Sequence, residues 1–401
     1  MIEEVKQLTA EAAKASAWNA LWTFPSIIGA ALIIAWGAES AQFLISQGFA
    51  LTMLALIQTL PEFAVEGVIA WRAGQVPTPE NIGLATANFT GALRLLIGLG
   101  WPLIYFVAAA FNINKKRRRG NLDNVKLDRE HSVELMGLLV PTLYMFVIVI
   151  KASLTIYDSI ILLTMYLIYI SILLRLPPHE EEKIIEIEPI PRYILTRPRF
   201  WRNLLIICCF LVGATAIYLV ADPFLESMLG LSVVVGVPTF VFVQWVAPFL
   251  SEFPEKVSAF YWAKSVDKAP MALMNMVSSG IAELTLLVSL IPIVYSISRG
   301  GIYGIDFDWG HRVEILLTTL QSLLGFLLLA NMSFRAYEAL GLFLLWVVQF
   351  IQPSIREEIL LVYGAWIILE LILAFTKKRR LLAFWEFKRI YNKHIRKPKP
   401  S

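Results

Sequence analysis

Stretches of about 20 mostly apolar residues recur along this chain of 401 residues, and each is long enough to cross a bilayer as a helix. Backbone polar groups cannot stay unpaired in lipid, so a run of such stretches is typical of a helical membrane protein. We expect an all-α integral membrane protein with eleven membrane helices, at 18–44, 48–71, 82–111, 132–151, 156–175, 203–222, 231–262, 270–297, 313–332, 336–352 and 357–376.

The composition agrees with this prediction and excludes several classes of protein. Hydrophobic residues make up 57% of the chain and charged residues 16%, against about 45–50% and 25% in soluble domains. A soluble enzyme and a nucleic-acid-binding protein are therefore excluded, although the net charge is +4. The two cysteines, Cys208 and Cys209, are adjacent and cannot build a disulfide framework or a zinc site. No cofactor is expected.

Basic residues indicate how the helices are oriented, because cytoplasmic loops carry the excess of Lys and Arg. Five basic residues at 115–119 follow the third helix, and the tail from Lys377 holds ten Lys or Arg against one acid. Placing both inside puts 26 of the 35 basic residues in inner loops and 6 in outer ones. We expect a multi-pass cell-membrane protein with its N-terminus outside and its C-terminus in the cytoplasm. The segment 381–395 is either a helix on the inner surface, in contact with membrane lipids, or a disordered basic tail.

An internal repeat divides the chain. His131-Ser-Val-Glu134 recurs 180 residues later as His311-Arg-Val-Glu314, and Leu60-Pro61-Glu62 matches Phe253-Pro254-Glu255. Each half holds five predicted helices, an odd number, so the two halves have opposite orientations in the membrane, as in many secondary transporters. We expect repeats at 1–175 and 203–353, a cytoplasmic linker at 176–202, and an extra helix with the basic tail at 354–401.

Ionisable residues within membrane helices are costly and mark functional sites by default. Here they cluster in the second helix of each half and in the helix that follows it. The candidate ligands are carboxylates and hydroxyls: Glu62, Glu66, Glu252, Glu255, Glu283, Thr59, Ser251 and Ser279. Two of these residues have simpler interpretations, because Glu252 could pair with Lys256 and Glu66 could neutralise Arg94. Asp158, Glu338, His131 and His311 lie near predicted helix ends, where capping or solvated roles are favoured.

Two prolines support a cation site. Pro61 and Pro254 interrupt their helices and free backbone carbonyls next to Glu62 and Glu255. Carboxylate, carbonyl and hydroxyl oxygens together form a hard cage that suits Ca²⁺, which takes 6–8 oxygen ligands.

These motifs resemble those of the calcium/cation antiporter superfamily, the sodium/calcium exchangers and their relatives. That family carries a Gly-Thr-Ser-Leu-Pro-Glu signature in each repeat, followed by a Gly-Asn-x-x-Gly-Ser-Asn-type stretch. The corresponding segments here are Ile57-Gln-Thr-Leu-Pro-Glu62 with Ala87-Asn-Phe-Thr-Gly-Ala92, and Leu250-Ser-Glu-Phe-Pro-Glu255 with Met274-Asn-Met-Val-Ser-Ser-Gly-Ile-Ala-Glu283. The resemblance implies central carboxylates at Glu62 and Glu255, hydroxyl ligands at Thr59, Ser251 and Ser279, and a further ligand at Glu283.

The chain also departs from the family pattern. Gln58 and Glu252 replace hydroxyl residues of the two signatures, and Ala92 and Leu96 stand where the first repeat would supply polar ligands. Arg94 lies between them. A guanidinium is always charged and needs a partner, so Arg94 is a possible internal counter-charge that holds Glu62 or Glu66 or takes a cation's place.

The resemblance implies a secondary active antiporter that exchanges a divalent cation, Ca²⁺, for H⁺ or Na⁺ by alternating access. Retained carboxylates with fewer neutral ligands favour H⁺ over Na⁺ as the counter-ion. The alternative is a transport-inactive member that serves as a membrane sensor or scaffold, whose signature would be Arg94 locked to Glu62. An intramembrane enzyme is not favoured, because the chain shows no buried His pair, Asp dyad or Gly-x-Ser-x-Gly stretch.

Overall fold

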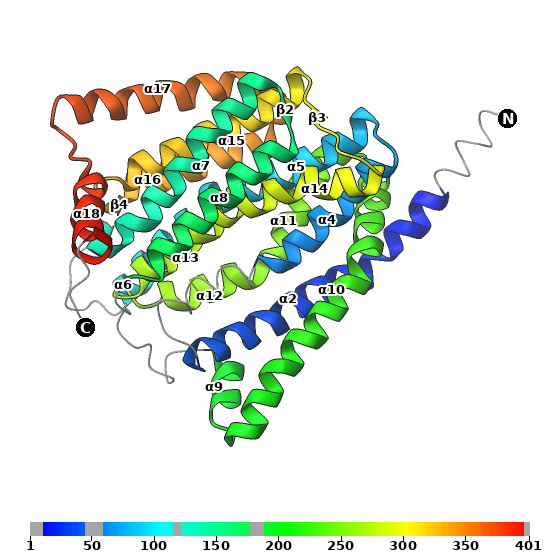
Figure 1. Cartoon of the computed structure of the whole chain (residues 1–401), viewed down its shortest axis with the longest axis horizontal. Coiled ribbons are helices and arrows are strands. Elements are labelled where there is room, and N and C mark those ends of the chain that lie inside the picture. Colours follow the sequence, from blue (N-terminus) through cyan, green and yellow to red (C-terminus); the bar gives the residue numbers. More distant parts are fainter. Residues whose placement is uncertain (1–10, 45–58, 115–121, 177–187, 397–401) are drawn as a thin grey trace.

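The fold is a bundle of helices with four very short strands in the loops (Figure 1). The computed structural model describes residues 11–44, 59–114, 122–176 and 188–396. The first half comprises α2 Ala20–Ala41, η1 Gln42–Leu44, α4 Leu60–Gln75, α5 Pro79–Leu95, η2 Leu96–Gly100, α6 Trp101–Asn114, β1 Asn124–Lys126, η3 Arg129–His131, α7 Ser132–Lys151, β2 Ser153–Leu154 and α8 Ile156–Leu173.

After the linker helix α9 Pro189–Leu195, the second half follows the same order. It comprises α10 Arg199–Val235, α11 Thr239–Ser251, α12 Phe253–Ala263, α13 Ala269–Ala282, η5 Glu283–Leu287, α14 Val288–Arg299, β3 Ile305–Asp306, α15 Trp309–Leu329, β4 Ser333–Arg335 and α16 Ala336–Ile351. The chain ends with η6 Pro353–Ile355, α17 Arg356–Phe375, α18 Leu382–Ile390 and η7 Tyr391–Arg396.

The all-α membrane architecture is confirmed. Within the described ranges, 8 helical segments are long and apolar enough to cross a membrane, and Thr239–Ser251 and Ala336–Ile351 are shorter apolar helices. The predicted helices at 82–111 and 270–297 are each one continuous helical rod with a π-helical stretch, η2 or η5, inside it. Part of the predicted helix 48–71, and the basic run 115–119, lie outside the described residues.

One predicted boundary is wrong. We expected separate helices at 203–222 and 231–262, but α10 runs unbroken from Arg199 to Val235 with Pro223 inside it. Asp222 and Glu226 lie on α10, where both pair with Arg72 at the end of α4, at 2.6 and 3.0 Å. The predicted helix 231–262 is interrupted as well, because Glu252 lies between the end of α11 and the start of α12.

Two antiparallel strand pairs join the two halves, and the internal repeat relates their registers. Val125 of β1 pairs with Phe334 of β4, and Leu154 of β2 pairs with Ile305 of β3. The 180-residue repeat offset relates Val125 to Ile305 and Leu154 to Phe334, so each ladder pairs a strand of one repeat with the other strand's counterpart in the second repeat. The offset also relates the left-handed residues Ala152 and Met332, whose φ angles are 57° and 61°. The ladders lie at different ends of the bundle in Figure 1, as two inverted repeats require.

Helices α2 and α10 pack against each other along much of their length and cross one face of the bundle (Figure 1). Their contact is close because Gly213 of α10 lies against Ile34 of α2, where a Cβ atom would come within 2.4 Å of that side chain. The pair spans more than the membrane, since 37 residues of α10 extend about 55 Å at 1.5 Å per residue.

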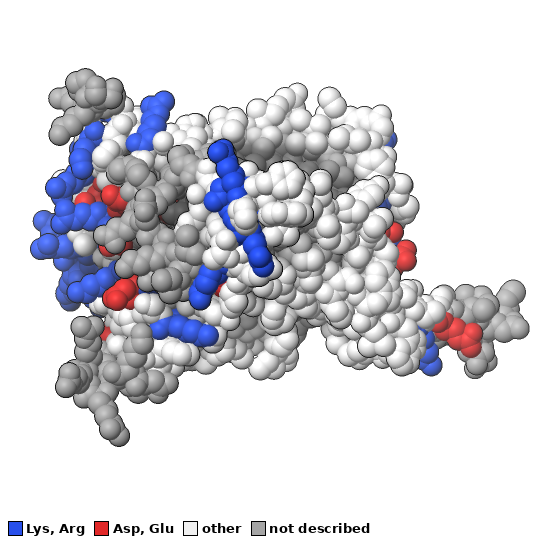
Figure 2. Space-filling view, turned by 90° about the horizontal axis from the view of Figure 1, so that it is seen from below, with Lys and Arg blue, Asp and Glu red and all other residues white. Residues whose placement is uncertain are grey.

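Of the two alternatives for the basic tail, the structure has the helix, as α18 and η7. Arg379 enters a buried acidic pocket, where it binds Glu338 of α16 and donates to Glu370 of α17 at 2.6 Å. The Ala383 N–H then donates to the Ala330 carbonyl at 2.9 Å, so α18 starts against the end of α15. Lys and Arg gather at this end of the molecule (Figure 2).

Candidate cation-binding site

Two helix starts bring carboxylates into the middle of the bundle. Glu62 lies in the first turn of α4 and Glu255 in the first turn of α12, each directly after a proline. Proline is favoured there because the first N–H groups of a helix have no acceptor in the helix. Those N–H groups also favour negative charge nearby. The matching Pro-Glu pairs of the two repeats therefore place two buried carboxylates at equivalent helix ends.

A third carboxylate comes from the helix that follows. Glu283 is the first residue of η5, and Leu96 is the first residue of η2 in the other half. Wider π turns are frequent at functional sites. Both halves keep this distortion, but only the second half carries an acid on it.

The carboxylates converge on one another. Glu62, Glu252 and Glu283 each offer an oxygen atom, and these three atoms lie within 4.8 Å of one another. Glu255 is near enough to Glu252 for electrostatic interaction and lies beside Ser279. Lys256 donates to Glu252 at 2.5 Å, as we expected. Four buried carboxylates thus face one ammonium group, so the cluster carries an excess of negative charge when all five are ionised.

Most oxygen atoms of this cluster have no hydrogen-bond partner among the described residues. They are both carboxylate oxygens of Glu62 and Glu283, one each of Glu252 and Glu255, and the Ser279 hydroxyl oxygen. Buried polar atoms are normally paired, and an unpaired one costs about 1–3 kcal/mol. Such a set of hard oxygens is what a Ca²⁺ ion binds.

The remaining candidate ligands lie beside the cluster in the chain. Thr59 is buried and directly precedes α4. Ser251 ends α11 and donates its hydroxyl to the Ala247 carbonyl at 3.0 Å, which leaves its lone pairs available to a cation. Glu66 is one turn beyond Glu62 and accepts a hydrogen bond of 2.8 Å from Asn88.

Arg94 does not hold either glutamate of α4. Its Nη2 atom donates to Glu314 of α15 at 2.5 Å, and its Nη1 atom donates to Gln349 of α16 at 3.2 Å. The reason is helical geometry: Asn88 uses the face of α5 that meets Glu66, and six residues at 3.6 per turn place Arg94 about 120° around the helix. The expected pairing with Glu62 or Glu66 is therefore wrong.

Arg94 instead belongs to a second buried network. Arg356 of α17 binds the other oxygen of Glu314, and Gln244 of α11 donates to Glu314 at 2.9 Å. The Arg94 guanidinium also lies 5.2 Å from the ring centre of Trp245. In the sequence, Glu314 stands out only as part of the repeat, through the recurrence of Glu134, and no motif marks Arg356.

A linker carboxylate was also missed. Glu188 accepts hydrogen bonds from Trp36 of α2 at 3.0 Å and from Ser258 of α12 at 3.2 Å. It therefore connects the α2–α10 pair to the helix that carries Glu255. Burial raises the pKa of the Glu188 carboxyl, although its two hydrogen bonds oppose the shift.

This raised pKa predicts a pH effect on stability. An unfolded glutamate titrates near about 4.3, so Glu188 contributes most below that pH and loses its contribution as pH rises through its folded pKa. The thermal stability of the wild-type chain relative to Glu188→Gln should therefore fall as the pH rises. Thermal unfolding of both proteins across pH tests this, with the exposed Glu358→Gln as control. Parallel pH profiles for wild type and Glu188→Gln would contradict it.

Comparisons with known proteins identify the family and the fold. Residues 15–175 and 205–351 match the family described as "Sodium/calcium exchanger protein". The crystal structure of the H⁺/Ca²⁺ exchanger CAX is similar, with 30% identity, a TM-score of 0.85, and coverage of 98% of this chain and 99% of that chain. The sodium–calcium exchanger NCX_Mj, soaked with 100 mM Na⁺ and 10 mM Sr²⁺, shares the fold at 15% identity and a TM-score of 0.52, covering 86% of this chain and 99% of that one. The search of curated proteins gives no match.

Proposed function

The chain belongs to the sodium/calcium exchanger protein family, and on that premise we propose that it is a secondary active antiporter that exchanges Ca²⁺ for protons. The observation that carries the proposal is the cluster of Glu62, Glu252 and Glu283, whose buried oxygens lie within 4.8 Å of one another. Glu255, Ser279, Thr59 and Ser251 complete the set of ligands, and Glu66 extends it along α4.

Charge explains the coupling. The four carboxylates of the cluster and Lys256 carry a net charge of −3 when all are ionised, which is too costly to leave uncompensated in a membrane interior. One Ca²⁺ offsets two of these charges, and protons on two carboxylates offset the same two. Ca²⁺ and H⁺ therefore compete for the same oxygens, and binding of one releases the other.

Protons suit the site better than Na⁺ because the first repeat offers few neutral ligands. Ala92 and Leu96 are buried apolar residues at positions related by the repeat to Ser279 and Glu283. Separate Na⁺ sites would need oxygen donors there. The similarity to the H⁺/Ca²⁺ exchanger CAX supports the same counter-ion.

Access to the site would change as the α2–α10 pair slides against the rest of the bundle. The pair packs mainly on itself, and the linker contact of Glu188 with Trp36 and Ser258 bridges the pair and α12. We place the basic end of the molecule, with α18, in the cytoplasm and the N-terminus outside, because Lys and Arg accumulate on the inner side.

The contacts of Arg94 argue against a transport-inactive member. Such a member would lock Arg94 to Glu62, whereas Arg94 binds Glu314. The Glu62 carboxylate is left available to a cation, which favours transport over a sensor or scaffold.

Flux measurements test the exchange. In proteoliposomes, we expect ⁴⁵Ca²⁺ uptake when the lumen is more acidic than the bath, and its loss when a protonophore collapses the gradient. A series with Ca²⁺, Mg²⁺, Mn²⁺ and Na⁺ identifies the competing ions. Uptake driven by a Na⁺ gradient and indifferent to pH would refute the proton as counter-ion.

A further inference from the structure

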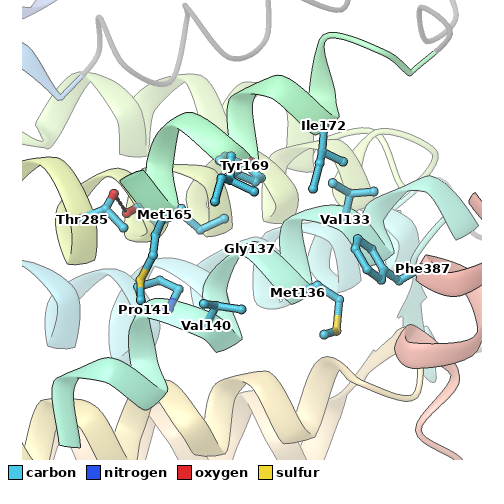
Figure 3. Close-up of a pocket in the computed structure, with 12 residues that line it drawn as sticks. Val133, Met136, Gly137, Val140, Pro141, Met165, Tyr169, Ile172, Thr285 and Phe387 are labelled. Atoms are coloured by element: carbon cyan, nitrogen blue, oxygen red, sulfur yellow. Dashed lines mark hydrogen bonds between the residues drawn. The ribbon is translucent and has the colours of Figure 1, made fainter. Parts of the chain in front are cut away.

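An apolar groove of about 240 Å³ lies between α7, α8, η5 and α18. Figure 3 shows Met136 and Val140 of α7, Met165 of α8 and Phe387 of α18 around it. From Val133 to Pro141, both lining residues, the groove follows α7 for about 12 Å at 1.5 Å per residue. It starts beside α18 and runs toward the middle of the membrane span.

The few polar groups in this groove are already paired. Thr285 donates its hydroxyl to the Ile281 carbonyl at 2.5 Å, which is drawn as a dashed line in Figure 3. The Tyr169 hydroxyl shares a hydrogen bond of 3.1 Å with Ser278. A polar ligand would gain nothing from these walls, so the shape and chemistry select a hydrocarbon chain.

The groove opens toward the surroundings of the bundle. Val140 and Ile168 line it and are 47% and 56% exposed, and both belong to helices long and apolar enough to span a membrane. Lipid tails are the hydrocarbon that surrounds such helices. A membrane lipid can therefore enter the groove sideways.

Basic residues follow the groove residue Phe387 in α18. Lys388 and Arg389 directly follow Phe387 and are exposed, and Figure 2 shows basic residues concentrated at this end. The one acid of α18, Glu386, faces Arg129 at 3.7 Å. Basic residues at a membrane surface attract anionic headgroups.

We propose that this groove is a binding site for an anionic phospholipid, with an acyl chain between α7 and α8 and the headgroup phosphate at Lys388 and Arg389. The lipid would hold α18 against α7 and so fix the basic tail to the transport bundle.

Native mass spectrometry of the purified full-length chain tests this, with phosphatidylglycerol and phosphatidylcholine of identical acyl chains as probes. Each basic residue near an anionic headgroup raises affinity about fivefold, so the two residues predict that phosphatidylglycerol binds about 25-fold more tightly than phosphatidylcholine. Lys388→Gln with Arg389→Gln should remove this preference, whereas Lys377→Gln with Lys378→Gln, in the same tail but outside α18, should keep it.

Two valines of α7 test whether an acyl chain occupies the groove. Val140→Trp fills the groove and should weaken binding of both lipids, whereas Val147→Trp, at an equally exposed position of 47% that does not line the groove, should not. On the wild-type chain, glycerol phosphate alone should fail to displace phosphatidylglycerol, a result that does not depend on any variant folding. Equal affinity for both lipids, equal effects of the two tryptophans, or displacement by glycerol phosphate would each overturn the proposal.

Discussion

Glu62→Gln is expected to abolish Ca²⁺ transport without unfolding the protein. Neither carboxylate oxygen of Glu62 has a hydrogen-bond partner among the described residues, so the substitution breaks no hydrogen bond there. A bound cation depends on it strongly, because removing one partner of a buried charge pair costs about 3–5 kcal/mol, or about 100-fold or more in affinity. Binding of Ca²⁺ by calorimetry and uptake in proteoliposomes measure the loss.

The same substitution should raise the stability of the cation-free protein. Glu62, Glu252 and Glu283 repel one another when ionised, and an amide at one position relieves that repulsion. Opposite effects on stability and binding are typical of functional sites. Glu134→Gln is the control, because it makes the same change in a buried glutamate of α7 outside the cluster. Normal Ca²⁺ uptake by Glu62→Gln would show that Glu62 does not bind the transported cation.

Glu314→Gln is expected to cause the largest loss of stability. Glu314 is the shared partner of Arg94, which is fully buried, and of Arg356. Without the carboxylate, two guanidinium groups face each other with no counter-charge, at a cost of about 3–5 kcal/mol. Unfolding of the purified protein by heat or denaturant measures the effect.

A double-mutant cycle separates this explanation from simple loss of packing. Arg94→Met added to Glu314→Gln removes one of the uncompensated charges, so the double variant should be less destabilised than the sum of the two single variants. A strictly additive result would contradict the ion-pair explanation. Ca²⁺ binding by the folded fraction should persist, since Arg94 and Glu314 pair with each other and with groups outside the carboxylate cluster.

The sequence predicted the helical membrane fold because long apolar stretches have few alternatives in lipid. It misplaced the boundary near Asp222 because charge and proline together usually mark a loop. In the structure these charges meet Arg72 instead, and α10 continues past them to Val235. Hydropathy alone does not reveal where such a helix stops.

The sequence predicted which carboxylates lie in the site better than it predicted their contacts. Proline next to glutamate in both repeats identified Glu62 and Glu255 directly. The central position of Glu252 and the partner of Arg94 depend on which way a helix faces and on contacts between residues 220 positions apart in the chain. Neither can be derived from spacing within one helix. The ligand roles of all eight candidates stay predictions, those of Glu62, Glu252, Glu255 and Glu283 included.

The two strand ladders have a consequence for the origin of the chain. β1 and β3 are the same strand in the two repeats, as are β2 and β4, and each ladder joins one strand of each kind. Two separate copies of a single repeat, inserted in opposite directions, would form the same two ladders with the same register. The present molecule thus has within one chain the arrangement of an antiparallel homodimer, but its halves are not identical: one carries Glu283 and the other Leu96 at the equivalent position.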